Sequence, residues 1–302
     1  MHRPIYRHTI FLALLACLLW STAFAGIKIG LTYTTPLRFA GIRFIISGLM
    51  IFPFVPDKKR NFSILGQNIK TVLLISLFQT VILYTLFYLG MDRTPAAIGA
   101  IIVGGGPLFV AFLAHFTTGR DPLTLRKIVA LLIGFSGIIL LAAARDREAG
   151  DHMTVLLGIG LLVGGNFAGS YGNILVSTRR TNLSPVFLTA VQIFIGGCTI
   201  FLLSLLFEGF TSGHKPLAYY LSLGWLSMLS AVAFTLWFII LSRPEVKVSE
   251  VNIWKFIIPV FGAVLSWLLV KGEHPLWHTV AGMILIASSI VIINLRKKST
   301  KS

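Results

Sequence analysis

Three basic side chains lie within long apolar stretches of the sequence: Lys28, Arg43 and Lys255. A charge in the hydrocarbon core of a bilayer is costly, so each is a candidate for a functional role. Lys28 is near the end of its stretch, where a long side chain can reach the membrane surface instead. Arg43 could bind a substrate carboxylate or hold helices together through backbone carbonyls. Lys255 follows Trp254 and could receive an anionic group, although Trp254 could equally be an interfacial anchor.

The positions of the acidic residues point in the same direction. All ten Asp and Glu fall in predicted loops or at the ends of apolar stretches. Exporters that exchange a proton for a cationic drug usually need a carboxylate at mid-membrane, and the interior charges here are all basic. This favours anionic or zwitterionic solutes, such as amino acids or other carboxylates, moved by facilitated diffusion or exchange. Neutral solutes would fit equally well.

Polar and aromatic side chains within the apolar stretches could line a substrate cavity. We expect the substrate-binding set to be Trp20, Arg43, Tyr84, Asn166, Trp237, Trp254 and Lys255. A wider group of polar residues, with Gln79, Tyr88, Asn173 and Gln192 among them, could contribute. The alternative for each is an interhelical hydrogen bond, because polar side chains in lipid must find partners.

A run of helix-weakening residues marks one apolar stretch: Gly104, Gly105 and Gly106 directly precede Pro107. Proline removes a helical hydrogen bond, and the freed carbonyls need other partners. The segment is therefore either a broken helix along a substrate path or a site of close helix packing. Pro259 occupies the matching place in a later stretch, which favours a shared role as a hinge or gate.

The elements that must position these residues follow from composition. The chain has 302 residues, of which 56% are hydrophobic and only 12% charged, about half the ~25% of a soluble domain. Ten apolar stretches, with ends uncertain by a few residues, span 9–29, 37–55, 72–91, 96–116, 128–144, 153–177, 186–207, 217–241, 251–270 and 276–295. They are continuous rather than alternating, which excludes a β-barrel. We predict an all-α polytopic membrane protein with ten transmembrane helices.

The basic residues predict the orientation. With the N-terminus inside, 17 of the 26 Lys and Arg fall on cytoplasmic segments and 6 on outer ones. This bias accounts for most of the net charge of +16 without nucleic-acid binding, and it places both termini in the cytoplasm. We expect a multi-pass protein of the plasma membrane. In one alternative, Ala23-Phe24-Ala25 is a signal-peptidase site and the first stretch is removed.

Two motifs occur twice at nearly the same offset. Pro-x-Phe-x-Ala-x-Leu is found at residues 107–113 and at 259–265, which are 152 residues apart. Gly-x-x-Pro-Leu follows at 119–123 and at 272–276, which are 153 residues apart. Two matches in register are hard to obtain by chance, so we interpret the chain as two homologous halves.

The halves are residues 1–146 and 151–302, and each holds five apolar stretches. An odd number makes the second half enter the membrane from the opposite side. Inverted repeats of this kind are typical of secondary transporters, whose substrate path lies at the repeat interface near the midplane.

The sequence resembles the drug/metabolite transporter superfamily, EamA type, over nearly its whole length and in both halves. The resemblance lies in Leu19-Trp20-Ser21-Thr22-Ala23-Phe24 with Lys28, in Arg43-Phe44, and in the Pro107 and Pro259 helices. The family usually has Gly-Glu after both of those helices. The second half keeps Gly272-Glu273, whereas the first has Gly119-Arg120. The resemblance implies a ten-helix carrier of small metabolites, often an exporter.

Other chemistry finds little support. His274 and His278 have a spacing that can bind zinc, but no further ligand is nearby, so we expect no metal and no cofactor. No phosphate-binding loop of the G-x-x-x-x-G-K-[ST] type is present, nor is a plausible catalytic set, so we expect no enzyme. Cys17 and Cys198 are small hydrophobic residues within apolar stretches.

The prediction is thus a secondary transporter of small organic metabolites that works by alternating access as a monomer or homodimer. The alternatives are a multidrug or nucleoside exporter, and a non-transporting scaffold or flippase component. A scaffold has no need of matched helix breakers and interior cations.

Overall fold

The computed structural model describes residues 3–118, 124–143, 151–179, 181–209, 213–243, 246 and 253–294, and all regular elements in these ranges are helical. The first half contains α1 (Arg3–Ser21), α2 (Ala23–Leu31), α3 (Pro36–Ile51), η1 (Phe52–Phe54), α4 (Lys58–Ser76), η2 (Leu77–Ile82), α5 (Leu83–Arg93), α6 (Ala96–Gly104), α7 (Gly106–Thr118) and α8 (Leu125–Ala143). The second contains α9 (His152–Thr178), α10 (Pro185–Phe207), α11 (Leu217–Leu241), η3 (Ile253–Phe256), α13 (Ile257–Leu269) and α14 (Trp277–Asn294). The first copy of the Gly-x-x-Pro-Leu motif, at 119–123, and residues 147–150, which join the two predicted halves, lie outside the described residues.

Proline and capping side chains set several helix starts. Pro36 and Pro185 are the first residues of α3 and α10, where a missing backbone N–H costs nothing. The hydroxyl of Ser184 accepts a hydrogen bond from the Phe187 N–H at 3.1 Å and caps α10. The carboxylate of Asp151 caps α9 in the same way.

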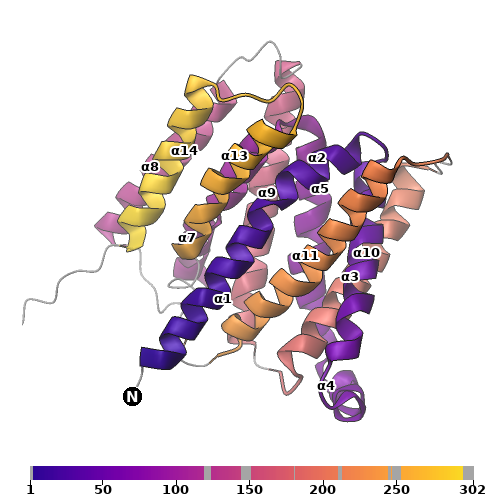
Figure 1. The fold of residues 1–302 in the computed structure, drawn as a ribbon. Coiled ribbons are helices and arrows are strands. Elements are labelled where there is room, and N and C mark those ends of the chain that lie inside the picture. The colour runs from indigo at the N-terminus through magenta and orange to yellow at the C-terminus, as the bar shows by residue number, and fades with distance from the viewer. Residues whose placement is uncertain are drawn as a thin grey trace, which may run out of the picture.

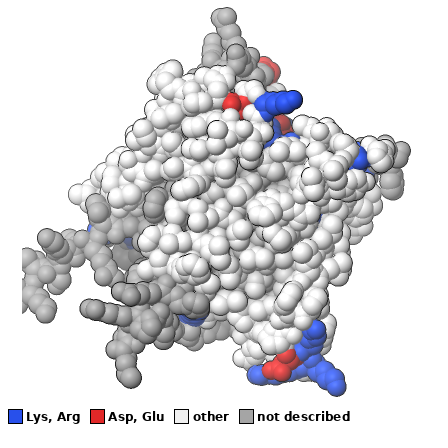
Figure 2. All heavy atoms as spheres, in the orientation of Figure 1, with Lys and Arg blue, Asp and Glu red and all other residues white. Residues whose placement is uncertain are grey.

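The molecule has an apolar belt between two charged ends. On the face shown in Figure 2, Lys, Arg, Asp and Glu gather toward the two ends and leave the middle uncharged. Large apolar side chains such as Leu132, Leu206 and Leu268 are exposed on the helices. Seven helices in the described ranges are long and apolar enough to cross a membrane, and shorter apolar helices accompany them. These features fit an all-helical polytopic membrane protein.

Helices occupy all ten predicted apolar stretches, but one boundary prediction is wrong. The third stretch was expected to begin at Val72, whereas the helical chain runs from Lys58 to Arg93 through α4, η2 and α5. Its polar beginning is helical because Asn61 donates to the carbonyls of Pro56 and Asp57 and fastens the first turn. Hydropathy locates the part of a helix that lies in lipid and not the ends of the helix.

Close packing joins helices that are far apart in the sequence. The most extensive contacts are between α3 and α10, α8 and α14, α5 and α9, α6 and α13, and α1 and α11. Figure 1 shows α8 beside α14 at one side of the molecule and α3 near α10 at the other. Gly48 and Gly197 let α3 and α10 approach, because a Cβ at either would lie within 3 Å of the facing helix.

Candidate substrate cavity

A cavity of about 100 Å³ lies among helices of both halves of the chain. Its walls come from α1, α2, α3, η2, α5, α6, α7, α9, α11, η3 and α13. Arg43 and Lys255 both line it, and no Asp or Glu is among its described lining residues. The volume is below the ~300–1,000 Å³ of typical small-molecule sites, so a solute of several heavy atoms requires the walls to move.

Arg43 is held firmly within the protein and is only 2% exposed. Its Nε donates to the Ser230 hydroxyl at 2.9 Å and to the Leu226 carbonyl at 3.2 Å. Its Nη1 donates to the Tyr88 hydroxyl at 2.7 Å. These bonds tie α3 to α5 and α11. The guanidinium thus bonds a backbone carbonyl, one of the two alternatives expected from the sequence, and it also lines the cavity.

Lys255 is held by aromatic faces instead. Its Nζ lies 4.7 Å from the centre of the Trp237 ring and 5.7 Å from that of Trp20. The two indole rings are 5.2 Å apart, edge to face. Within the described part of the chain, Nζ has no hydrogen-bond acceptor. An ammonium over indole rings is stabilised by the ring quadrupole, yet it keeps its donors for a ligand.

An amide network continues from Trp237. Its indole N–H donates to Oδ1 of Asn173 at 3.2 Å, and Nε2 of Gln79 donates to the same oxygen at 3.3 Å. Gln79 and Asn173 also line the cavity. They belong to the wider group of polar residues that sequence analysis named without singling them out.

The helix is interrupted at the three glycines. α6 ends at Gly104 and α7 begins at Gly106. The amide Nδ2 of Asn166 donates to the Ile102 carbonyl at 2.6 Å, and the Ser170 hydroxyl lies 3.4 Å from the Gly106 carbonyl oxygen. Two side chains of α9 therefore provide donors at the break, beside the cavity.

Gly104, where α6 ends, also touches Pro259 in the first turn of α13. A Cβ at Gly104 would lie within 3 Å of the Pro259 ring, so α6 and α13 meet at these two residues. Close packing and a broken helix were expected as alternatives, and the segment combines them. Gly106, two residues on, lines the cavity.

Of the remaining residues predicted to bind substrate, three line the cavity and one does not. Tyr84 lines the cavity, with its ring 4.4 Å from that of Phe44, and Trp20 and Trp237 form the wall beside Lys255. Trp254 is half-buried and is not among the residues that line this cavity. The reason is that Trp254 and Lys255 are adjacent on a 3₁₀ turn, where neighbouring side chains point in different directions.

The carboxylates serve at one end of the molecule as helix caps. Glu208, after α10, accepts the backbone N–H groups of Leu37 at 2.8 Å and Arg38 at 3.0 Å, the first turn of α3. Glu273, after α13, accepts the first two backbone N–H groups of α6 at 2.5 and 3.1 Å. Anions at a helix N-terminus are favourable. Each of these helices is capped from the helix that packs against it.

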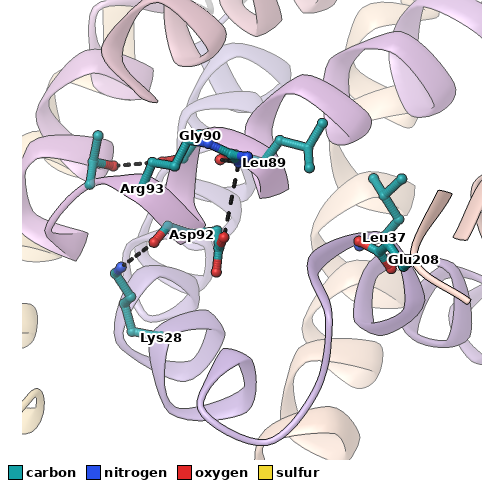
Figure 3. A network of polar contacts seen from close by, with 8 residues as sticks. Lys28, Leu37, Leu89, Gly90, Asp92, Arg93 and Glu208 are labelled. Atoms are coloured by element: carbon teal, nitrogen blue, oxygen red, sulfur yellow. Dashed lines mark hydrogen bonds and ion pairs between the residues drawn. The ribbon is translucent and has the colours of Figure 1, made fainter. Parts of the chain in front are cut away.

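Figure 3 shows this end from close by, with Glu208 against Leu37 and Lys28 reaching toward Asp92. The Nζ of Lys28 lies 3.5 Å from the Asp92 carbonyl oxygen, a weak contact at the edge of the bundle. Among the described residues, no group of three or more His, Cys, Asp or Glu could hold a metal ion.

An apolar helical bundle with a charged cavity between its helices is the architecture of a polytopic membrane protein, and comparison with known proteins identifies it as a transporter and not an enzyme. The model of the EamA-like transporter family matches residues 7–143 and again residues 156–295. The chain belongs to this family.

Named relatives and one solved structure extend the match to nearly the whole chain. The uncharacterized transporter YvbV of Bacillus subtilis is 25% identical over 300 residues, 99% of this chain and 95% of the relative. An S-adenosylmethionine/S-adenosylhomocysteine transporter of Chlamydia trachomatis is 23% identical over 90% of this chain and 85% of the relative. A crystal structure with 17% identity has a TM-score of 0.69 and covers 98% of both chains, which shows the shared fold.

Proposed function

We propose that this protein is a secondary transporter of small anionic or zwitterionic metabolites, with amino acids and other carboxylates as the first candidates. The observation that carries the proposal is the cavity itself. Arg43 and Lys255 both line it, and no carboxylate among its described lining residues balances them. A buried charge without a counter-ion is unfavourable, so an anionic group entering the cavity gains strong electrostatic stabilisation.

Alternating access is the mechanism we propose, with two inverted five-helix halves of ten helices in all. The two matches of the family model support it, one in each half. The helix pairing supports it as well, because α3 packs on α10 and α8 packs on α14, and these are elements that the repeat relates to one another. The contact between Gly104, at the end of α6, and Pro259, in the first turn of α13, offers a place where the two helices can move against each other.

The same proposal includes the membrane and the orientation. We place the chain in the plasma membrane with both termini in the cytoplasm, on the basis of the Lys and Arg distribution. The Glu208 and Glu273 end is then the outer end. Its two carboxylate caps would hold that end closed while the cavity loads from the other side. The protein acts as a monomer or homodimer.

The first test is a thermal-stability screen of the purified protein. A ligand that binds only the folded state raises the melting temperature by mass action. The panel should hold amino acids, organic acids, nucleosides and cationic drugs. S-adenosylmethionine and S-adenosylhomocysteine belong in it because a relative is named for them. We expect carboxylate-bearing solutes to raise the melting temperature and to be taken up by proteoliposomes.

Matched variants give the screen its control. In Lys255→Met the shift should be lost, whereas Lys127→Met, at the start of α8 and away from the cavity, should keep it. If only cationic or neutral drugs stabilise the protein, the multidrug alternative replaces this proposal. If no solute of any class binds or is transported, the scaffold alternative gains.

A further inference from the structure

A second cavity, of about 260 Å³, lies where three helices of the second half end or begin. Its walls come from the end of α9, the start of α10, and the end of α11 with the turn that follows it. It shares no lining residue with the candidate substrate cavity. Because α10 runs from this cavity to Glu208, the cavity lies at the opposite end of the molecule from the two carboxylate caps.

Two arginines give this cavity a positive charge. Arg179 and Arg243 line it, and no Asp or Glu is among its described lining residues. Arginines that follow a helix often bond its last carbonyls. Within the described part of the chain, however, the guanidinium of Arg179 makes no hydrogen bond, and that of Arg243 makes one, from Nη1 to the Thr9 hydroxyl at 2.6 Å. Both groups therefore keep most of their N–H donors for a ligand.

The other lining side chains suit a ligand with both an anionic and an apolar part. The hydroxyls of Thr181 and Ser242 have no hydrogen-bond partner among the described residues, so they add two donors. α10 begins in the wall at Pro185, and the N-terminal end of a helix favours an anion. The rest of the lining includes four buried apolar side chains: Val176, Leu183, Leu188 and Leu241.

The depth of the arginines matches that of lipid phosphates. The apolar spans of α9 and α11 end at Thr178 and Leu241, so Arg179 and Arg243 follow the spans by one and two residues. Charged headgroups lie directly outside the hydrocarbon core of a bilayer. Guanidinium groups match the oxygens of a phosphate, and basic pockets between membrane helices on the cytoplasmic side bind anionic lipid headgroups.

We infer that this cavity binds the phosphate of an anionic phospholipid through Arg179 and Arg243. The inference does not depend on the transported solute, and only its assignment to the cytoplasmic leaflet rests on the orientation proposed above. A phosphate between the two arginines would link α9 to α11, and Arg243 already bonds to Thr9 of α1. All three helices also line the candidate substrate cavity. Bound lipid should therefore stabilise the folded bundle.

The test measures the melting temperature of the purified full-length protein in neutral detergent. The added probes are dioleoyl phosphatidylglycerol, dioleoyl phosphatidylcholine and inorganic phosphate. We expect phosphatidylglycerol to raise the melting temperature at concentrations where the other two do not, because phosphatidylcholine carries its own cation and inorganic phosphate has no apolar part. In Arg179→Gln, about fivefold more phosphatidylglycerol should be needed for the same shift, which corresponds to the ~1 kcal/mol that one arginine contributes near a membrane surface.

Arg126→Gln is the matched control, because it also removes one positive charge, from the first turn of α8 and outside this cavity. It should keep the affinity of the unchanged protein for phosphatidylglycerol. Native mass spectrometry gives a second readout. The unchanged protein and Arg126→Gln should each retain one molecule of phosphatidylglycerol, whereas the double variant Arg179→Gln/Arg243→Gln should retain none. Since Arg179 makes no hydrogen bond within the described residues, its single variant carries the test if the double variant does not fold.

The outcomes separate a lipid site from its alternatives. If phosphatidylcholine stabilises the protein as well as phosphatidylglycerol does, or if Arg126→Gln weakens binding as much as Arg179→Gln, the arginine pair is not a specific site and the inference is wrong. If inorganic phosphate alone produces the whole shift, the cavity takes a soluble phosphate and the lipid is wrong. None of these results changes the proposed transport function. Conversely, a screen in which no carboxylate binds would overturn that function and leave the lipid site standing.

Discussion

The two cations of the cavity differ in how the protein holds them. Arg43 makes three hydrogen bonds to two neighbouring helices. Lys255 rests on two indole rings, and its ammonium donates no hydrogen bond within the described residues. Both charges lack a carboxylate partner in the cavity, but only Arg43 donates hydrogen bonds within the described residues. The charge of Arg43 is therefore part of the helix packing, whereas the ammonium of Lys255 is available to a ligand.

The chemistry of the two side chains explains the division. A planar guanidinium offers five N–H donors in a fixed arrangement, so it can join several helices and still turn an edge to the cavity. A lysine ammonium is a compact charge on a flexible chain, and aromatic faces hold it without using its hydrogen bonds. We therefore expect the loss of Arg43 to be seen in stability and the loss of Lys255 in transport.

The largest effect is expected from Arg43→Met. The substitution removes three hydrogen bonds and leaves the Tyr88 and Ser230 hydroxyls to find new partners in the interior. Since each buried group left unpaired costs about 1–3 kcal/mol, we expect a loss of roughly 3 kcal/mol in the free energy of unfolding. Unfolding of the purified protein in detergent measures it. If the melting temperature equals that of the unchanged protein, Arg43 is not the structural cation of the pair.

Lys255→Met should have a large effect on function and a small effect on stability. The variant loses one cation–π interaction, worth about 0.5–2 kcal/mol, and regains part of this through apolar contact with Trp20 and Trp237. We expect proteoliposome uptake of carboxylates to fall at least tenfold while the melting temperature changes little. If instead uptake persists and the protein unfolds easily, Lys255 is the structural cation and the assignment is reversed.

Tyr88→Phe tests the support of Arg43 without removing the charge. It deletes one hydrogen bond, so we expect a loss of about 1 kcal/mol in the free energy of unfolding and a modest decrease in uptake. Tyr84→Phe is the matched control, since Tyr84 lies on the same helix and lines the cavity but its hydroxyl makes no hydrogen bond within the described residues. Equal losses from the two variants would mean that the Tyr88 bond contributes nothing specific.

Lys28→Met should give the smallest effect and completes the comparison. This third cation makes a 3.5 Å contact with the Asp92 carbonyl at the edge of the bundle, near the carboxylates of Asp92 and Glu273. Exposed charge contacts are worth about 0–1 kcal/mol, so we expect changes in stability and uptake that are close to the error of measurement. If uptake falls strongly while stability stays normal, the substrate passes through the end of the molecule that holds Lys28, Glu208 and Glu273.

Much of this protein could be predicted from its sequence. In a bilayer, apolar length decides where helices lie, so each of the ten apolar stretches found by hydropathy is helical, although the polar beginning of α4 was missed. The cost of burying charge singled out Arg43 and Lys255, and the duplicated proline motifs identified the helices that meet at Gly104 and Pro259. The membrane environment makes these signals strong because it tolerates few exceptions.

Only the tertiary structure decided which partner each of these residues has. The sequence could not show that Arg43 is tied to α5 and α11 while Lys255 rests on indole rings, because those partners lie far away in the chain. Nor could it reveal that residues 77–82 form a π turn around Gln79, since they contain no helix breaker, or place Trp254 outside the cavity lining. Hydropathy and spacing report how deep a residue lies and on which helix. Which way its side chain points, and what it bonds, depend on how the helices pack.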